Sequence, residues 1–421
     1  MRPKVVITGM GTVNPLSLNV QETWKIAISG KSGIGKITHF DSDQHATRFA
    51  GEVKEFDPTS RFGKKTARHM DRFVQFAVAA TEEALQDSSL NITDSNRDRI
   101  GVIIGTGIGG VSTLEKQTAT LRKSGPKRVS PFMVPMMLPD TAAGQVAINF
   151  GARGPNLCIT SACASSTNAL GEAAEIIRRG SADVVIAGGA EAAITPVTIA
   201  AFANMGALSS RNDDPTLACR PFDRERDGFV AGEGAAILLL ETEQHAIERG
   251  AMIYGEIAGY GLSNDAHHIT APASDGASAI ISMELAIRDS KLKSTEIDYI
   301  NAHGTSTPLN DKTETLAIKQ VFGEHAYGIP ISSTKSMHGH LLGAAGALEA
   351  IMCIQSLVHG IVPPTINQFT SDPECDLDYV ANNSRKLVAN AIMSNSFGFG
   401  GHNASLVFTK YRANNQSTIN A

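Results

Sequence analysis

The stretch Asn156-Leu-Cys-Ile-Thr-Ser-Ala-Cys-Ala-Ser-Ser-Thr-Asn-Ala-Leu170 joins a short apolar run to a run of small residues. Leu157 to Thr160 predicts a buried strand. Residues 164–179 predict a helix that ends at Gly180, because glycine suits the position after a helix C-terminus. Cys163 falls at the junction, where free backbone N–H groups and the helix dipole favour a thiolate. Cys163 is therefore a candidate nucleophile, and a small buried structural cysteine is the alternative.

Composition and charge are ordinary for a soluble globular enzyme. The 421 residues are 42% hydrophobic and 19% charged, enough for two or three domains or one large duplicated fold. The formal net charge of −5 argues against general nucleic-acid binding. We find no signal peptide and no apolar run long enough to span a membrane, so we expect a cytoplasmic protein. The cysteines are odd in number and form no CxxC pair, which favours free thiols in a reducing compartment: Cys158, Cys163, Cys219, Cys353 and Cys375.

Strand patterns alternate with helix patterns along the chain, which predicts an α/β fold with a parallel or mixed sheet. Residues 9–14, rich in glycine, are expected to form a turn after the first strand. The expected strands are 5–8, 99–105, 183–189, 235–240, 297–301, 391–397 and 406–409, and the expected helices are 20–29, 73–85, 140–150, 242–249, 277–290 and 341–358.

The pattern restarts after residue 250. Tyr254-Gly-Glu-Ile-Ala-Gly-Tyr-Gly261 echoes Val5-Val-Ile-Thr-Gly-Met-Gly11. An echo of this kind indicates two similar halves. We therefore expect an N-terminal half over 1–250, a C-terminal half over 251–410 and a polar tail over 411–421.

Gly105-Thr-Gly-Ile-Gly-Gly110 matches the G-x-G-x-x-G fingerprint of dinucleotide-binding folds and follows a predicted strand. The match is weak, because no acidic residue stands about 20 positions further on. That region reads Lys123-Ser-Gly-Pro-Lys-Arg128 instead. A nucleotide site is therefore a minor alternative.

Two further stretches have open interpretations. Residues 60–73 are basic, and they predict either a solvated face or a docking patch for an acidic partner. Residues 209–234 are polar and contain Arg220-Pro-Phe-Asp223 and Asp227-Gly-Phe-Val-Ala-Gly-Glu-Gly234. A long connection with so much glycine indicates a functional loop.

Two histidines in the second half stand at the ends of predicted elements, where α/β folds collect catalytic groups. His303 lies in Asn301-Ala-His-Gly-Thr-Ser-Thr-Pro-Leu-Asn-Asp311, and His340 lies in Ser333-Thr-Lys-Ser-Met-His-Gly-His-Leu-Leu-Gly-Ala-Ala-Gly346. Taken singly, each suits capping or packing. A zinc site is the metal alternative, but no third ligand has HExxH-like spacing. One cysteine with two histidines suits acyl transfer.

Four separated motifs, in this order, resemble the β-ketoacyl-acyl carrier protein synthases, most closely their type II, elongating branch. They are Thr160-Ser-Ala-Cys-Ala-Ser-Ser166, the two histidine motifs, and Asn395-Ser-Phe-Gly-Phe-Gly-Gly-His-Asn403, and the match begins at Val5-Val-Ile-Thr-Gly-Met-Gly11. The resemblance covers nearly the whole chain. It implies a thiolase fold, in which two similar α/β halves form five layers in the order α-β-α-β-α, and it implies a homodimer.

The resemblance also assigns the chemistry. Cys163 resembles the acylated nucleophile, and His303 and His340 resemble the histidines of decarboxylation. Lys335 matches a lysine whose charge partner is Glu349. Phe399 matches a gating phenylalanine, and its backbone N–H, with that of Cys163, resembles an oxyanion hole.

Binding residues follow from the same resemblance. Thr270, Thr305 and Thr307 resemble contacts to a phosphopantetheine arm, while Ala271 stands where a serine is often found. Ile108, Ala193 and Phe202 fall where the family lines its acyl pocket, so the glycine run at 105 suits a pocket wall better than a nucleotide loop. Lys64, Lys65 and Arg68 resemble docking residues for an acidic carrier protein.

The implied reaction is the decarboxylative condensation of malonyl carrier protein with an acyl chain held on Cys163. We expect no metal and no cofactor of the protein's own, because the carrier brings the phosphopantetheine. Two alternatives are the ketosynthase subunit of a type II polyketide or polyene pathway and a non-catalytic chain-length factor in a heterodimer. The second usually lacks the cysteine, so the presence of Cys163, His303 and His340 argues against it.

Overall fold

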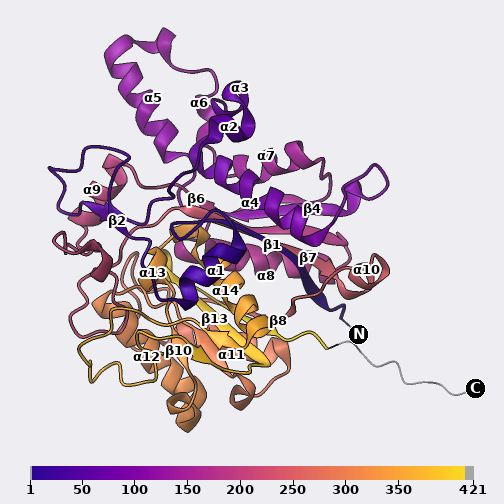
Figure 1. Cartoon of the computed structure of the whole chain (residues 1–421), viewed down its shortest axis with the longest axis vertical. Helices are drawn as coiled ribbons and strands as arrows, with labels where there is room; N and C mark the ends of the chain where they lie inside the picture. Colours follow the sequence, from indigo (N-terminus) through magenta and orange to yellow (C-terminus); the bar gives the residue numbers. More distant parts are fainter. Residues whose placement is uncertain (1, 413–421) are drawn as a thin grey trace, which may run out of the picture.

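The computed structural model describes residues 2–412 and has a mixed ten-stranded sheet at its centre (Figure 1). The strand order is β10-β9-β13-β14-β8-β1-β7-β6-β4-β5. The strands are β1 (Val5–Val13), β4 (Ile100–Gly105), β5 (Asn156–Ile159), β6 (Val184–Glu191), β7 (Gly234–Thr242), β8 (Gly255–Asn264), β9 (Tyr299–Asn301), β10 (Ile331–Ser332), β13 (Ala391–Gly398) and β14 (His402–Thr409). Two short strand pairs lie outside it, β2 (Gly35–Lys36) with β3 (Phe49–Ala50) and β11 (Ile361–Val362) with β12 (Arg385–Lys386).

The helices alternate with these strands as the sequence predicts. They are α1 (Val20–Ile28), α2 (Pro58–Phe62), α3 (Lys64–Ala67), α4 (Arg72–Ser88), α5 (Val111–Ser124), α6 (Met133–Met137), α7 (Thr141–Phe150), α8 (Ser165–Arg178), α9 (Pro196–Asn204), α10 (Glu243–Glu248), α11 (Ala277–Ser290), α12 (Pro308–Phe322), α13 (Lys335–His338) and α14 (Ala345–His359). Three short 3₁₀ turns bear on the site: η3 (Ala162–Ala164), η7 (Leu342–Ala344) and η8 (Phe399–Gly401).

The two halves of the sheet repeat one topology. In the first half β1 is antiparallel to β7, β7 is antiparallel to β6, and β6, β4 and β5 are parallel. In the second half β8, β14, β13, β9 and β10 make the same pairings in the same order. The halves join where β1 pairs with β8 over a short stretch. The predicted repeat is therefore present, while the domain boundary at residue 250 stays a prediction.

Five layers follow from how the strands distribute their side chains. Neighbouring residues of a strand point to opposite faces of a sheet. In β6, Val185 and Ala187 pack into the central core around α8 and α14, whereas Val184 and Ile186 pack outward against α4 and α7. In the second half, the inner face of the sheet packs against α8 and α14, and the outer face packs against α11 and α12. This α-β-α-β-α arrangement confirms the predicted fold class (Figure 1).

The turn predicted over residues 9–14 is wrong, because β1 continues to Val13. Gly9 and Gly11 lie inside this strand, directly beneath α4. A Cβ at these positions would lie 2.3 Å from the carbonyl oxygen of Ala84 and 2.0 Å from that of Ala80. These glycines therefore permit close packing of a helix on a strand. A glycine inside a strand often marks such a close approach of another backbone.

Within residues 2–412, one helical stretch, Leu342–His359, has the length and apolar composition of a membrane span, and 89% of it is buried inside the fold. It is the central helix that the sequence predicts over 341–358. From residue 413 onward, the predicted polar tail lies outside the described residues.

Candidate active site

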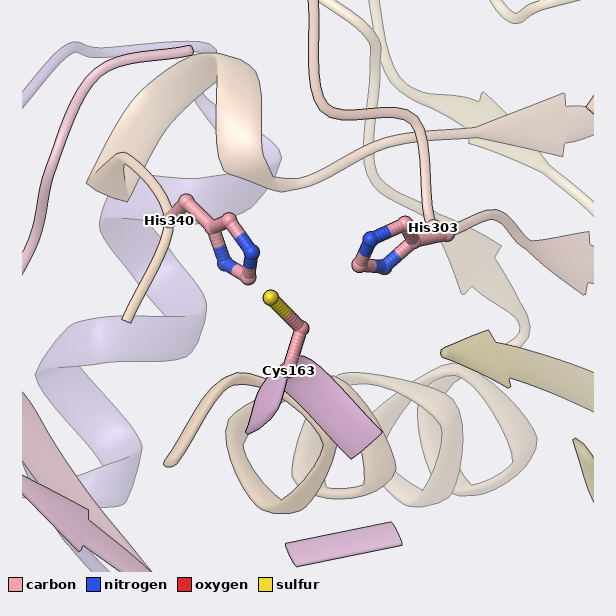
Figure 2. Close-up of side chains that lie close together, drawn as sticks. All are labelled: Cys163, His303 and His340. Atoms are coloured by element: carbon pink, nitrogen blue, oxygen red, sulfur yellow. The ribbon is translucent and has the colours of Figure 1, made fainter. Parts of the chain in front are cut away.

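Cys163 lies in a strained turn between β5 and α8, as the sequence predicts. Ala162 has a φ of +48°, which is unusual for a residue with a Cβ. The Ser165 hydroxyl holds the turn by accepting from the backbone N–H of Ser161 at 2.9 Å and donating to the carbonyl of Ala162 at 2.6 Å. The turn thereby presents the Cys163 side chain at the entrance to α8 (Figure 2).

One feature of this segment differs from the prediction. β5 is not a buried strand, since it is the edge of the sheet and Leu157 is 48% exposed. An apolar run predicts burial but does not show whether this chain or another molecule covers it.

His340 occupies the corresponding turn of the second half, before α14. Leu342 has a φ of +49°, like Ala162 in the first half. The Leu342 backbone N–H donates to Nδ1 of His340 at 3.2 Å. Because Nδ1 accepts, the neutral ring carries its proton on Nε2. Nε2 has no hydrogen-bond partner among the described residues, so this N–H remains free to donate to a ligand.

His303 follows β9 and is fixed through its backbone. The Glu314 carboxylate, on α12, accepts the N–H groups of His303 and Gly304, each at 2.8 Å. The ring lies 5.4 Å from that of His340, centroid to centroid, and is nearly perpendicular to it at 83°. The Cys163 sulfur and one nitrogen of each ring lie within 4.8 Å of one another (Figure 2).

Both histidines are neutral. Burial lowers the pKa of His303 and of His340 well below the usual value, and the nearby Lys335 ammonium lowers both further. Lys335 is fully buried and forms an ion pair with Glu349, which is also fully buried. Burial raises the pKa of Glu349, while the Lys335 ammonium opposes that rise. Neutral imidazoles donate N–H bonds without adding charge to the site.

The pKa of the Cys163 thiol is raised, whereas its position at the entrance to a helix predicts a lowered pKa. Burial raises the pKa of Cys163 to about 11, and this effect outweighs the stabilisation of the thiolate by Lys335 and by the backbone N–H of Phe399. The sequence shows the helix N-terminus but not the loss of water around the sulfur, and desolvation disfavours a charged group. Near neutral pH this pKa keeps Cys163 in its thiol form.

A cavity of about 520 Å³ opens above Cys163, His303 and His340. Ile108 and Phe202 line it, as do Phe399 and the three predicted threonines Thr270, Thr305 and Thr307. The hydroxyls of Thr305 and Thr307 lie 3.0 Å apart. Ala193 does not line this cavity; it is buried in the apolar cluster behind Phe202.

The glycine run at 105 forms the wall of this cavity. Gly105 packs against α8, where an added Cβ would lie 2.5 Å from the backbone of Ser165. Gly107 and Ile108 line the cavity, and the buried Glu191 carboxylate accepts the backbone N–H of each. The glycine run therefore lies in a cavity wall, as the resemblance implies, and its role as an acyl pocket stays a prediction.

Some residues of the cavity were not predicted from the sequence. Phe229 lines the cavity and belongs to the glycine-rich 209–234 stretch, which the sequence predicts to be a functional loop. Asp265 and Asn403 line the cavity and are hydrogen-bonded to each other at 2.7 Å. Glu314 carried no signal of its own, because its role is visible only once α12 is placed beside β9.

The predicted docking residues lie together on the surface. Lys64 and Lys65 begin α3 and Arg68 follows it, and all three side chains are exposed. Among residues 2–412 none of the three forms an ion pair. Arg61 and Arg72 of the same basic stretch differ, because they pair with Glu82 and Glu233.

The metal alternative has a geometric basis. Cys163, His303 and His340 are the kinds of ligand that zinc binds, and their atoms are close enough to share an ion. The expectation that the reaction needs no metal stays a prediction.

The five-layered fold and the Cys-His-His site define a condensing enzyme of the thiolase type. Family models described as "Beta-ketoacyl synthase, N-terminal domain" and "Beta-ketoacyl synthase, C-terminal domain" match residues 2–246 and 254–369. The chain belongs to the β-ketoacyl synthase family and is an acyltransferase-class condensing enzyme.

Within the family, its curated relatives include synthases named 3-oxoacyl-[acyl-carrier-protein] synthase 2. It is 53% identical to the 3-oxoacyl-[acyl-carrier-protein] synthase 2 of Synechocystis sp., covering 98% of this chain and 99% of the relative. It is 52% identical to the enzyme of the same name in Staphylococcus aureus strain N315, covering 97% and 99%.

Solved structures agree on the fold. A β-ketoacyl synthase from Burkholderia phymatum superposes with a TM-score of 0.91 at 39% identity, covering 97% of this chain and 100% of that one. The complex AntDE:AntF, a type II polyketide acyl-carrier protein with its ketosynthase, gives 0.91 at 37% identity, covering 98% and 100%.

Proposed function

We propose that this condensing enzyme elongates fatty acyl chains, with malonyl carrier protein as donor and Cys163 as carrier of the growing chain. One observation carries the proposal. A single thiol and two neutral imidazoles converge within 4.8 Å at the floor of a cavity, and threonine hydroxyls line the same cavity. The whole-length similarity to synthases named 3-oxoacyl-[acyl-carrier-protein] synthase 2 supports the fatty acid pathway over the polyketide alternative.

In the first half-reaction the Cys163 sulfur attacks the thioester carbonyl of an acyl carrier. The backbone N–H groups of Cys163 and Phe399 form the oxyanion hole for the tetrahedral intermediate. The carrier sulfur then leaves and takes the proton that Cys163 loses. A preorganised donor of this kind is typically worth about 3 kcal/mol in the transition state.

In the second half-reaction malonyl carrier occupies the same cavity. The N–H groups of His303 and His340 donate to its thioester oxygen and stabilise the enolate that forms as CO2 leaves. The enolate carbon attacks the acyl carbonyl on Cys163, and collapse of the intermediate returns the sulfur as a thiolate, which takes a proton. Burial and the nearby Lys335 ammonium keep the histidines neutral, and Glu349 pairs with that ammonium. Thr270, Thr305 and Thr307 bind the phosphopantetheine arm, so the protein needs no cofactor of its own.

Phe399 is the proposed gate between these stages. It begins η8, and Gly400 next to it has a φ of +80°, a conformation that glycine adopts without strain. Gly398 is less free, because an added Cβ would lie 3.0 Å from the backbone nitrogen of Cys163. Movement of Phe399 therefore pivots on Gly400 and changes the position of one oxyanion donor.

The direct test is intact-mass analysis of the protein after incubation with acyl carriers of graded chain length. The proposal requires a mass increase of one acyl group on Cys163, and release of a 3-oxoacyl carrier once malonyl carrier is added. The chain lengths that load fastest report the preferred substrate. A protein that never acquires an acyl group would fit the chain-length-factor alternative instead.

A charge-reversal variant tests docking of the acidic carrier protein. The triple change Lys64→Glu, Lys65→Glu and Arg68→Glu should raise KM for acyl carrier protein by at least about tenfold and weaken the salt dependence of KM, because the patch steers association. Turnover of small acyl-pantetheine thioesters should change less than twofold. The matched control is Arg61→Glu, which breaks the pair with Glu82 and a hydrogen bond to the carbonyl of Ala79. Equal losses with both substrate types would count against docking.

We also propose that two copies of the chain form a dimer through β5. This strand is a sheet edge with free backbone groups, and such edges invite pairing. Exposed apolar side chains surround it, including Leu157 on β5 itself and Ile148, 74% exposed, on α7. A cytoplasmic homodimer is the expected assembly. A native mass of one chain at micromolar concentration would contradict it.

A further inference from the structure

The glycine-rich connection that the sequence singles out supplies no catalytic side chain, yet part of it contacts both sides of the cavity. We call this part the 220–232 segment. Its backbone contacts the turn formed by Thr305, Ser306 and Thr307, and it also contacts His340. The function proposed above gives this segment no role.

Two backbone groups of the 220–232 segment hold the threonine turn from behind. The Arg220 N–H donates to the Ser306 hydroxyl at 3.0 Å, and the Gly228 N–H donates to the Ser306 carbonyl at 3.1 Å. Ser306 has a φ of +69°, a conformation that a residue with a Cβ adopts only at a cost of about 1–3 kcal/mol. These bonds therefore maintain a strained turn whose neighbours on both sides line the cavity.

The Arg226 side chain completes this support. Its guanidinium donates to the carbonyl of Thr307 at 3.2 Å and to the carbonyl of Pro308 at 3.1 Å. Only 5% of the side chain is exposed, and its charge is balanced by ion pairs with Asp372 and with the fully buried Asp311. Thr307 is also the N-cap of α12. Arg226 thus fixes the point where the threonine turn enters this helix.

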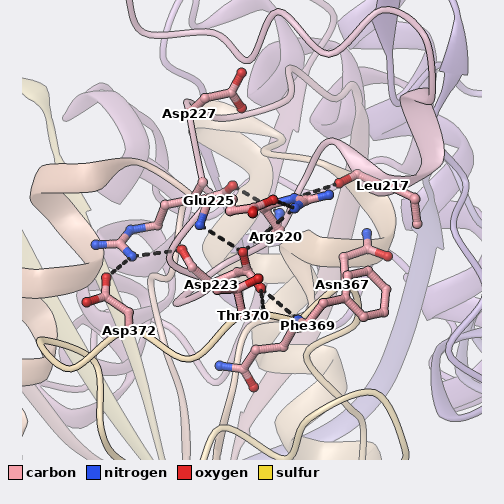
Figure 3. Close-up of polar contacts among 12 residues, drawn as sticks. Leu217, Arg220, Asp223, Glu225, Asp227, Asn367, Phe369, Thr370 and Asp372 are labelled. Atoms are coloured by element: carbon pink, nitrogen blue, oxygen red, sulfur yellow. Dashed lines mark hydrogen bonds and ion pairs between the residues drawn. The ribbon is translucent and has the colours of Figure 1, made fainter.

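Asp223 and Asp372 connect the segment to a second loop. The Asp223 carboxylate accepts the N–H groups of Phe369 and Thr370, each at 2.7 Å (Figure 3). Asp372 lies on the same loop and holds Arg226. Because a planar guanidinium offers five donors in fixed directions, a lysine at position 226 cannot reproduce these contacts.

The contact with His340 uses backbone groups instead. The His340 N–H donates to the carbonyl of Val230 at 2.7 Å, and the Gly232 N–H donates to the carbonyl of His340 at 2.8 Å. The Phe229 ring lies edge-on to the imidazole at 5.5 Å. A change at residue 226 removes none of these bonds, so its effect should be confined to the threonine turn.

We propose that Arg226, held by Asp372, is a positioning residue that sets the Thr305–Thr307 turn to bind the pantetheine arm of both substrates. This proposal rests on the proposed function, since it takes the threonine hydroxyls as contacts of that arm. Arg226 touches no reacting atom. Its loss weakens substrate binding and leaves the Cys163 thiol and the two imidazoles as they are.

The experiment measures KM and kcat of Arg226→Lys and Asp372→Asn with malonyl- and acyl-pantetheine thioesters. Both variants should raise KM by about tenfold for each thioester and change kcat less than threefold, because a misplaced contact loses binding without altering the chemistry. The rate at which iodoacetamide alkylates Cys163 should be unchanged, which also shows that the site is folded. Asp372→Asn keeps Arg226 and serves if the lysine variant does not fold.

Two further variants separate the possible outcomes. Arg249→Lys is the matched control, because Arg249 also bonds a carboxylate, Glu241, and a backbone carbonyl, Ser88, but lies away from the cavity. It should lower stability without changing KM. Thr307→Val should raise KM as Arg226→Lys does. If Thr307→Val raises KM and the variants at 226 and 372 do not, the positioning role is wrong and the proposed function stands. If neither changes KM, the threonine turn does not bind the arm, and both assignments fail.

Discussion

Cys163→Ala should abolish acyl transfer and condensation while malonyl decarboxylation continues. Acyl transfer needs a sulfur to carry the chain, and Cys163 is the only cysteine among the residues that line the cavity. Loss of a covalent nucleophile lowers the rate by at least about 10³-fold. Decarboxylation differs, because the enolate needs only the N–H groups of His303 and His340, which lie on separate elements and are not held by the sulfur.

The assay sets carbon dioxide release from malonyl carrier beside acyl-enzyme mass. Cys158→Ala is the matched control, since Cys158 lies five residues earlier, on β5, and its sulfur lies 3.9 Å from the Thr160 hydroxyl and does not line the cavity. It should load acyl groups normally. A folded Cys163→Ala protein that releases no carbon dioxide would show that the histidines are not an independent decarboxylation site, and the division of roles would be wrong.

The sequence predicted the parts of the site that depend on short-range pattern. Cys163 stood between a strand and a helix of small residues, and the structure places it in that turn. His303 followed a predicted strand, and His340 stood at the entry to a predicted helix. The hydrophobic periodicity did not show that these histidines lie beside Cys163, because that contact depends on the repeat that brings the ends of α8 and α14 together. The resemblance to a family predicted the contact instead.

What the sequence could not show depends on long-range packing and on water. The pKa of Cys163 rises because several distant segments bury the sulfur, so the helix N-terminus alone predicts the wrong direction. Gly9 and Gly11 predict a turn unless α4 is already known to lie on β1. The helix α12 had a usable local signal, since Thr307 caps it and Pro308 begins it. The sequence of helix α5 carries little signal, because Thr113 is its only buried residue and the helix therefore has no apolar face to recognise.

The same burial explains why the histidines suit the second half-reaction. A protonated imidazole beside Lys335 would place two cations in a dry site, so the fold holds both rings neutral. A neutral ring still donates one N–H, and His340 directs that N–H into the site because Nδ1 is occupied by Leu342. The carbon dioxide that leaves is uncharged, and the charge of the enolate stays on the oxygen that these donors face.

His303→Ala and His340→Ala should each lower malonyl decarboxylation by about 10²–10³-fold, the usual cost of removing one preorganised donor. Both should still accept an acyl group on Cys163, because the oxyanion hole of that step uses backbone N–H groups. His340→Asn should recover part of the lost rate, since its amide can donate an N–H. His359→Ala is the control, because His359 stacks on Trp24 at the far end of α14 and should change stability alone.

The pH dependence gives this prediction its second measurement. For a histidine with a lowered pKa, the neutral donor form is present above that pKa and is lost only as pH falls through it. Because the pKa values of His303 and His340 lie well below 6.5, decarboxylation by the Cys163→Ala protein should be flat from about pH 6 to pH 8. A rate that falls tenfold as pH rises through 6.5 would mean that an imidazolium does the work, and the assignment of neutral donors would be wrong.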